Sequence, residues 1–475
     1  MAAYYNVDEV ESALKGLANT YPDLCELLEL PNRTHEGRTC HALRMRKRDA
    51  GYRTGVLFTA AAHAREWGGS ECAVNFAADL LEKYTAGTGL RYGKTAFDAD
   101  QIRAIVENVD VFVVACVNPD GRNFSQQGAP GSRQSLWRKN RAPNIDPEVS
   151  AIGTDINRNF PFLWSVHDHF SPSVLDASSL GSSQPSKETY YGSAPKSEPE
   201  TRNVIWLLDE FPQIEWLLDI HSYGGDVLYS WGDAPNQNSR PEMNFHNRRF
   251  DQQRGTDDVS RYGEYIDPDD ERRMREVVSA VTGAVSGVRG QDYTGKQAFY
   301  LTVPGSGEMT YPTSGTVDDY AYSRHIVDGW ATKVLGFTIE FGLAGGFHPP
   351  GEDFHPPWEE MEKIVLDVSA GMVAFCVQAV RPPVYLPFDP HVVAPEFRPD
   401  FWVLSGIIDG GPGWVLVNNR PVFVKPPDPR LQDLLTRVGE YLAVPELQSS
   451  GAVERQRVAL EKVIELSGSL LKELG

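Results

Sequence analysis

The amino-acid sequence predicts an α/β fold in which a mixed, mostly parallel twisted sheet is flanked by helices. The chain contains four short apolar runs rich in β-branched or aromatic residues, at 54–61, 109–117, 216–221 and 335–341. Such runs are typical of strands that are buried on both faces. Helical patterns lie between them, and strands that alternate with helices of this length form layered α/β folds.

The helical patterns can be placed in chain order. The run at 54–61 is followed by a helical pattern from Ser70 to Tyr84. Ahead of the run at 216–221, the segment Ser197-Glu-Pro-Glu200 has the spacing of a capping box and precedes Val-Ile-Trp-Leu-Leu. We therefore expect a helix to begin there.

Composition limits the class of protein. The 475 residues are 41% hydrophobic and 23% charged, and no apolar run approaches the length of about 18 residues that a membrane helix needs. The formal net charge of −20 argues against binding to nucleic acid, because phosphate recognition needs a basic surface. We expect a soluble enzyme that binds neither nucleic acid nor membrane; the sequence specifies no oligomeric state.

Five widely spaced cysteines form no CxxC pair and do not indicate a disulfide framework. The first residues lack the basic and apolar regions of a signal peptide, so we expect a cytoplasmic protein. A secreted enzyme in its mature form would read in the same way.

The residues that follow two of the predicted strands suggest a metal site. His63-Ala-Arg-Glu66 comes directly after the run at 54–61, and His221 closes a later run. Two nitrogens and one carboxylate make a three-ligand zinc set with an open fourth position, whereas a structural zinc is usually closed by four ligands. His-x-x-Glu alone also fits a solvated helix start. Since ligands gather at the carboxyl ends of strands, the two segments together predict one catalytic zinc.

Five further segments complete a recognisable set. They are Asn118-Pro-Asp-Gly121, Trp137-Arg-Lys-Asn-Arg141, Thr154-Asp-Ile-Asn-Arg-Asn-Phe160, Tyr311-Pro-Thr-Ser-Gly-Thr-Val-Asp-Asp-Tyr320 and Gly336-Phe-Thr-Ile-Glu-Phe-Gly342. With the two zinc segments, the sequence resembles the M14 zinc carboxypeptidases from about Tyr4 to about Val380. The resemblance implies a zinc enzyme that hydrolyses the C-terminal bond of peptides or proteins.

The resemblance also implies catalytic roles. Zinc would be held by His63, Glu66 and His221, and would activate a water and polarise the carbonyl. Glu340 matches the family's catalytic glutamate, which takes the proton of the water and passes it to the leaving amine. Arg138 matches the arginine that stabilises the oxyanion.

Substrate recognition is implied in the same way. Asn157 and Arg158 match the pair that binds the terminal carboxylate of the substrate, and Tyr311 matches the tyrosine that caps it. These roles imply an exopeptidase, because an internal peptide bond offers no such carboxylate.

Three softer matches concern supporting positions. Asp155 matches the carboxylate that orients a zinc-bound histidine. Arg65 and Tyr223 match positions that contact the substrate upstream of the scissile bond. Glu71 is expected to lie on the surface of a helix.

Asp318 matches the pocket position that is acidic in carboxypeptidase B-like enzymes and apolar in A-like ones. A buried carboxylate there would pair with lysine or arginine, so the resemblance implies a preference for basic C-terminal residues. A shift of the loop next to Asp319 would instead move Asp318 away from the pocket.

We expect residues 1–385 to form the catalytic domain, with 236–307 as a longer surface insertion that carries a helix from Asp270 to Val285. Residues 386–475 form an extension whose role the sequence leaves open. It contains a small β unit at 401–424 and helical patterns at 429–443 and 452–474.

Two other functions fit the same residues. The scaffold could serve a peptidase that acts on cell-wall peptides or amino-acid amides, if the insertion narrows the cleft. It could also be an inactive zinc-binding interaction module. An inactive relative usually lacks the base or an arginine, and Glu340, Arg138 and Arg158 are all present.

Overall fold

A computed structural model describes residues 4–48, 51–143, 152–303, 307–329, 331–343 and 353–380, and strands at 384–385, 413–417 and 420–424. The chain forms two compact units. The first comprises residues 1–48, 53–327 and 333–382, and the second comprises 49–52, 328–332 and 383–475. The boundary expected at 385 remains a prediction, because most of the extension lies outside the described residues.

In the described part of the first unit, eight strands form one sheet in the order β1-β2-β7-β4-β8-β15-β9-β12. Their bounds are β1 (Cys25–Glu29), β2 (His41–Met45), β4 (Thr54–Ala60), β7 (Val109–Val114), β8 (Ile214–Gly224), β9 (Asp226–Tyr229), β12 (Thr294–Gln297) and β15 (Leu335–Leu343). The central strands β7, β4, β8 and β15 are parallel. Antiparallel pairs flank them on both sides, β1 with β2 and β9 with β15. The predicted mixed sheet is confirmed.

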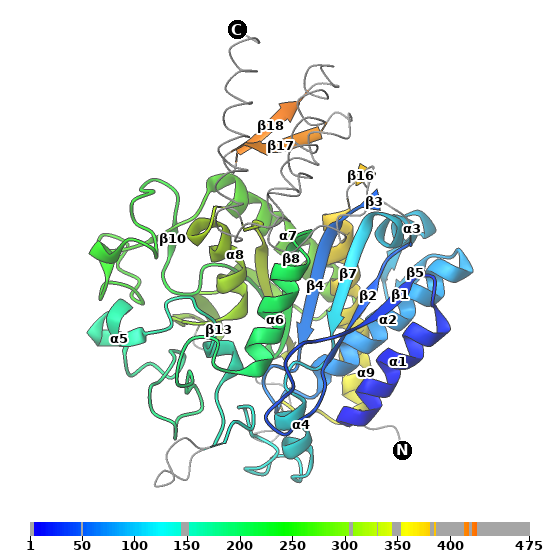
Figure 1. The fold of residues 1–475 in the computed structure, drawn as a ribbon, viewed down its shortest axis with the longest axis horizontal. Coiled ribbons are helices and arrows are strands. Elements are labelled where there is room, and N and C mark those ends of the chain that lie inside the picture. The colour runs from blue at the N-terminus through cyan, green and yellow to red at the C-terminus, as the bar shows by residue number, and fades with distance from the viewer. Residues whose placement is uncertain are drawn as a thin grey trace, which may run out of the picture. The chain divides into compact units, whose positions relative to one another are not determined.

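Helices cover both faces of this sheet. Those that pack in the larger core are α1 (Val7–Thr20), α2 (Gly68–Ala86), α3 (Ala99–Asn108), α7 (Pro268–Arg289) and α9 (Trp358–Ala379). The smaller core on the opposite face is covered by α6 (Pro199–Glu210) and α8 (Val317–Val327). Figure 1 shows α6 in front of the central strands and α9 behind them.

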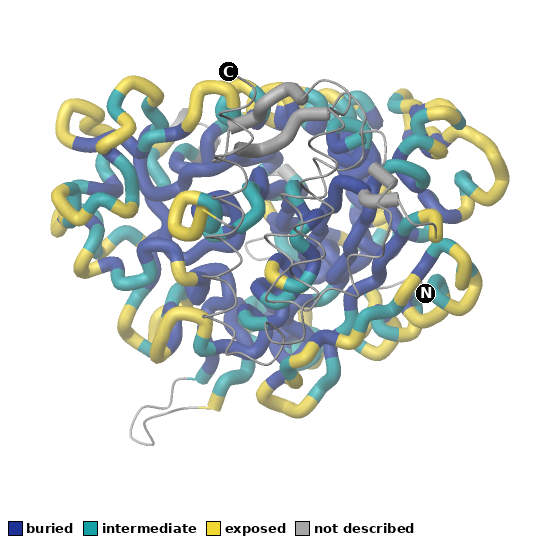
Figure 2. The backbone as a smooth tube through the Cα atoms, turned by 45° about the horizontal axis from the view of Figure 1, so that its top comes forward, coloured by how far each residue is buried: buried dark blue, intermediate teal, exposed yellow. Residues whose placement is uncertain are grey.

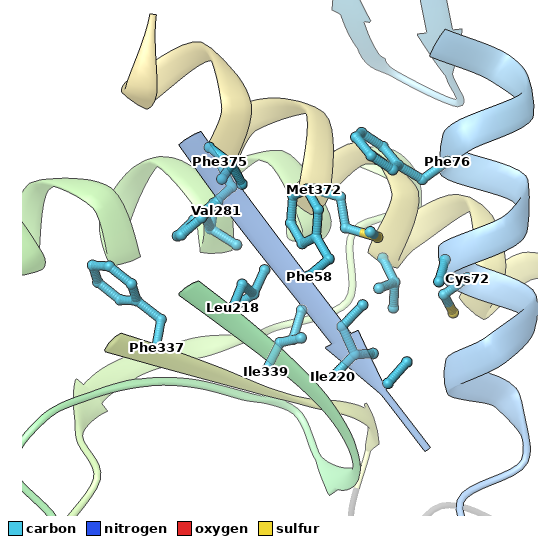
Figure 3. Close-up of a cluster of buried hydrophobic side chains, with 14 of the residues drawn as sticks. Phe58, Cys72, Phe76, Leu218, Ile220, Val281, Phe337, Ile339, Met372 and Phe375 are labelled. Carbon is cyan, nitrogen blue, oxygen red and sulfur yellow. The ribbon is translucent and has the colours of Figure 1, made fainter. Parts of the chain in front are cut away.

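The central strands are apolar on both sides because they are buried on both sides. Phe58, Leu218 and Phe337 point into the larger core, while Leu57 and Leu217, one position earlier, point into the smaller one. Figure 3 shows the first three side chains packed with residues of α2, α7 and α9. In Figure 2 the strands are buried and the exposed backbone is concentrated in the connections. This burial makes the sheet a rigid support for the strand ends.

Shorter elements lie around the sheet of the first unit. They are β5 (Leu90–Tyr92), β6 (Thr95–Phe97), α4 (Pro119–Gln126), η1 (Ile156–Arg158), α5 (Val166–His169), η2 (Pro172–Val174), β10 (Asn236–Gln237), η3 (Arg248–Phe250), β11 (Glu264–Tyr265), β13 (Tyr300–Val303) and β14 (Gly307–Thr310). Within the described ranges, none of the helices is both long and apolar enough to cross a membrane.

In the second unit, β16 (Val384–Tyr385) pairs with β3 (Gly51–Tyr52), and β17 (Gly413–Val417) pairs with β18 (Arg420–Val424). The last pair falls within the predicted small β unit. The helices expected at 429–443 and 452–474, and the residues from 401 to 412, lie outside the described residues.

The capping box predicted at Ser197 is wrong. The helix α6 begins at Pro199, Glu198 occupies the N-cap without a side-chain capping bond, and the Ser197 hydroxyl donates to Glu198 Oε1 at 2.6 Å. Glu198 Oε2 instead contacts His35 and Asn140, so tertiary contacts replace the local cap. The helix in the insertion is also longer than expected, from Pro268 to Arg289, because Asp267 caps its start and Gly290 ends it.

Glu71 is buried, which contradicts the expected surface position. Its Oε1 accepts from Arg122 Nη2 at 3.0 Å and from the Tyr5 amide at 2.7 Å. Arg122 also donates to the backbone oxygen of Trp67. Trp67 follows the predicted ligand Glu66, so this buried ion pair fixes the segment that carries the ligand.

Because Glu71 pairs with a fully buried guanidinium, Glu71→Ala should leave an uncompensated charge and destabilise the fold by about 3–5 kcal/mol. Urea denaturation followed by circular dichroism measures this. Glu82→Ala, on the exposed face of the same helix, should change stability by less than about 0.5 kcal/mol. Equal effects of the two substitutions would contradict a structural role for Glu71.

Candidate active site

The sheet register brings the predicted ligands together. The strands β4 and β8 are parallel neighbours with Ala60 opposite Ile220, so His63 and His221 emerge at the same edge. The strand β15 lies on the other side of β8, with Glu340 opposite His221. The pairing of β4, β8 and β15 therefore positions two predicted ligands, His63 and His221, and the predicted base Glu340.

The three predicted ligands converge in a buried cluster. Glu66 Oε1 lies 2.7 Å from His63 Nδ1, and Glu66 Oε2 lies 2.8 Å from His221 Nδ1. The two Nδ1 atoms are 3.0 Å apart. All three side chains are at least nine-tenths buried. Each offers one ligand atom toward a common point.

The far nitrogens of both histidines face carboxylates. His63 Nε2 lies 3.3 Å from Asp155 Oδ1, and His221 Nε2 contacts Asp219 Oδ2. Asp155 therefore lies next to a predicted histidine ligand, as the family resemblance implies. Asp219 was missed, although a residue two positions before His221 on a strand must share its face. Carboxylates in these positions favour protons on the Nε2 atoms and leave the Nδ1 lone pairs directed at the cluster.

This donor set fits zinc. At bond lengths of 2.0–2.1 Å, tetrahedral ligand atoms lie about 3.3 Å apart, close to the spacing of this cluster. Burial alone would raise the pKa of Glu66, but the two histidines hold it well below its usual range, so Glu66 is ionised. Two imidazoles and one carboxylate leave one position for water or substrate.

A second His/Glu/Glu group has a different character. His35, Glu198 and Glu200 also lie within ligand distance of one another. The Asn140 amide nitrogen donates to both carboxylates at 2.7 and 3.0 Å, and its oxygen is fixed by the Thr154 amide. An N–H group thus occupies the place that a cation would take between these carboxylates.

Glu340 lies beside the cluster. Burial raises the pKa of Glu340 to about 8. The negative charges of Glu66 and Asp226 also raise this pKa, whereas His221 lowers it. A dication held by the three ligands would favour the ionised form. Asp226 is opposite Glu340 in the pairing of β9 with β15 and was not anticipated from the sequence.

Arg138 and Arg158 have buried guanidinium groups. Arg138 Nε donates to Asp155 Oδ2 at 2.8 Å, so one carboxylate contacts both His63 and Arg138. Arg158 Nε donates to the Ser179 carbonyl at 2.9 Å. Tyr311 is close enough to influence the pKa of both arginines, and it is only partly buried. A substrate anion would meet two fixed cations and a hydroxyl.

Asn157 has a partly structural role. Its Nδ2 atom lies 3.3 Å from His221 Nε2, and its Oδ1 atom accepts from the Val317 amide at 2.9 Å. Asn157 therefore lies between His221 and the start of α8, where the Val317 amide holds it.

The upstream substrate positions form an aromatic contact. The Arg65 guanidinium lies 4.4 Å from the centre of the Phe354 ring, and Tyr223 meets the same ring edge-on at 5.0 Å. Arg65 also pairs with Glu188 at 2.8 Å. Phe354 was missed because nothing in its sequence neighbourhood marks it.

Asp318 is buried at the start of α8. Its carboxylate accepts from the Thr338 hydroxyl and from the Asp319 amide, both at 3.0 Å. The loop before it passes directly over Arg158, since a Cβ atom on Gly315 would lie 2.4 Å from the Arg158 oxygen. Burial lowers the pKa of Arg158 overall, although the charge of Asp318 acts to raise it.

The chain is similar to known proteins. The model of the zinc carboxypeptidase family matches residues 10–363. Metallocarboxypeptidase A of Trichophyton rubrum is 30% identical over 235 residues, which cover 48% of each chain. Zinc carboxypeptidase A 1 of Drosophila melanogaster is 25% identical over 370 residues, 76% of this chain and 67% of the relative. Mouse carboxypeptidase A4 is 27% identical to the chain over the matched region. The chain spans about half the length of this relative and of the Trichophyton rubrum enzyme.

Solved structures agree in fold. Carboxypeptidase A from Helicoverpa armigera aligns with a TM-score of 0.57 at 22% identity, over 79% of this chain and 74% of that one. Thrombin-activatable fibrinolysis inhibitor aligns with a TM-score of 0.56 at 19% identity, with the same coverage. Together with the family match over most of the catalytic unit, these findings show that the chain belongs to the zinc carboxypeptidase family.

Proposed function

We propose that this chain is a zinc metallocarboxypeptidase that removes the C-terminal residue of peptides or proteins. The observation that carries the proposal is the convergence of His63 Nδ1, His221 Nδ1 and Glu66, with Glu340 on the adjacent strand. Zinc bound there would polarise the scissile carbonyl and acidify a water molecule.

The residues of the chain supply the proton transfers. Glu340, ionised beside a dication, takes a proton from the attacking water and gives it to the departing amine. Its position on the strand next to His221 places the carboxyl beside the proposed zinc-bound water. Asp155 and Asp219 hold the ligand rings in one tautomer throughout.

Arg138 would stabilise the oxyanion, and its guanidinium is already oriented by Asp155. Arg158, Asn157 and Tyr311 would bind the terminal carboxylate of the substrate. A fixed guanidinium would set where the scissile bond lies, because it binds a free carboxylate and an internal peptide bond offers none.

Preference for lysine or arginine at the C-terminus is the finer part of the proposal. The burial of Asp318, three residues after the glycine that packs against Arg158, supports it. An apolar side chain in the same pocket would leave this carboxylate without a compensating cation.

The metal assignment predicts about one zinc per chain by atomic emission spectroscopy. His63→Ala and His221→Ala should lower occupancy strongly, because two remaining protein ligands hold zinc poorly. His246→Ala, on an exposed histidine, is the control and should keep full occupancy. Unchanged zinc in both ligand variants would refute the assignment.

Glu340→Gln keeps the shape of the side chain and removes the base. We expect kcat to fall by about 10²–10⁴ or more while zinc content is retained, because a positioned base contributes this much. Steady-state hydrolysis of a short peptide measures the effect, with exposed Glu82→Gln as the control. Retention of wild-type kcat would show that another group transfers the proton.

Asp318→Ala should reduce kcat/KM for peptides ending in arginine by roughly 10- to 1000-fold, and should affect peptides ending in leucine much less. The exposed Asp269→Ala variant controls for general surface charge, whose effect salt would screen. An unchanged ratio of arginine to leucine cleavage would leave the peptidase assignment intact and eliminate the basic preference.

A further inference from the structure

The first residues that the structure describes lie against the segment that carries Phe354. The Tyr4 hydroxyl donates to the Pro356 backbone oxygen at 2.7 Å, although 352 positions separate the two residues in the sequence. The Tyr4 ring also meets the Trp67 ring edge-on at 5.5 Å and the Trp358 ring edge-on at 5.6 Å. One side chain therefore joins parts of the chain that are remote in the sequence.

The backbone of the next residue fixes the position of Tyr4. The Tyr5 amide donates to Glu71 Oε1 at 2.7 Å. The Tyr5 carbonyl accepts from Arg122 Nη2 at 2.7 Å and from Gln126 Nε2 at 2.8 Å. Glu71 and Arg122 are themselves buried and paired at 3.0 Å. These bonds hold the backbone without use of the Tyr5 side chain, since that residue is 38% exposed.

Trp67 makes a second contact with the segment that carries Phe354. The centre of its ring lies 3.7 Å from that of His355, with 33° between the planes, and both side chains are buried. The Trp67 indole N–H donates to the Ser125 hydroxyl at 2.9 Å, so the orientation of the indole is fixed. We call the four residues Tyr4, Trp67, His355 and Pro356 the aromatic clamp.

Phe354 directly precedes the clamped residues. Its half-buried ring contacts Arg65 and Tyr223, the two residues that the family resemblance assigns to substrate contacts upstream of the scissile bond. One peptide bond joins Phe354 to His355, which is packed on a buried tryptophan. Because protein interiors are close-packed, the backbone of Phe354 cannot shift without disturbing this contact. The aromatic clamp therefore determines where the Phe354 ring lies.

We propose that Tyr4 is a positioning residue for the upstream part of the substrate. Through the aromatic clamp it holds Phe354 against Arg65 and Tyr223, and these three side chains bind the peptide residues that precede the scissile bond. Tyr4 acts through Phe354 and not by contact with the substrate. The inference rests on the carboxypeptidase function proposed above, and it adds a contribution of upstream residues to substrate binding.

A purely structural role of Tyr4 would have a different kinetic signature. Loss of its packing lowers stability, and a less stable protein contains less active enzyme. That loss lowers the rate on every peptide in proportion. Loss of the upstream binding position instead raises KM for long peptides and leaves the shortest ones unaffected, because they have no residue to place there.

The test compares two peptides with the same last two residues. One is an N-terminally blocked dipeptide, and the other extends it upstream by several residues. The ratio of their kcat/KM values, long to short, does not depend on the concentration of active enzyme. It is also independent of the preference for the C-terminal residue, which both peptides share. We expect the wild type to favour the longer peptide.

Substitutions of Tyr4 should change this ratio. Tyr4→Ala should lower it roughly 2- to 10-fold, the range for one aromatic contact, through a higher KM for the long peptide at unchanged kcat. Tyr4→Phe keeps the ring and removes only the hydrogen bond to Pro356, so we expect a smaller fall of about twofold. This variant decides the question if Tyr4→Ala folds poorly, which thermal denaturation would reveal.

Tyr5→Ala is the matched control. It removes an exposed aromatic ring at the adjacent position and keeps the backbone bonds to Glu71 and Arg122. The ratio should therefore equal that of the wild type.

A double-mutant cycle shows whether Tyr4 acts through Phe354. Phe354→Ala alone should lower the ratio at least as much as Tyr4→Ala does. Adding Tyr4→Ala to Phe354→Ala should then have no further effect, because the clamp has no ring left to position. Residues that act independently would instead give effects that multiply.

The outcomes separate this inference from the proposed function. If the zinc-loaded protein cleaves neither peptide, both fall together. If it cleaves both without favouring the longer one, or if the ratio is unchanged in Tyr4→Ala and Tyr4→Phe, only the inference is overturned. Multiplying effects of Tyr4→Ala and Phe354→Ala would overturn it in the same way.

Discussion

The pairing of β4, β8 and β15 is the constraint on which the site depends. Ala60 lies opposite Ile220, and Glu340 lies opposite His221. A slip of one residue would turn His221 and Glu340 to the opposite face of the sheet. The register is protected because both faces are buried, so each slip would also misplace a full row of apolar side chains.

Charge compensation is the second organising feature. Asp155 contacts both His63 and Arg138, and thereby connects the cluster of predicted ligands to a buried guanidinium. Burial makes each unpaired charge costly, so these groups define one another's orientation.

The sequence predicted the parts of the fold that follow from local patterns. The runs at 54–61 and 335–341 form β4 and β15, and the motif residues after them supply His63 and Glu340. Predictions failed where tertiary contacts decide the outcome. Glu71 has the polarity of a surface residue, yet a distant arginine buries it.

Other site features lay beyond sequence reasoning for the same reason. Phe354 contacts Arg65 and Tyr223 although it is far from both in the sequence. Asp219 could have been found, because its spacing from His221 on a strand fixes its direction.

The most direct test of the central claim uses one peptide in two forms, with a free C-terminal carboxylate and with a C-terminal amide. Mass spectrometry of the zinc-loaded protein's products should show removal of single residues from the free form and little or no cleavage of the amide, because the amide removes the charge that Arg158 would bind. Equal cleavage of both forms, or cleavage at internal bonds, would contradict an exopeptidase site built around that arginine.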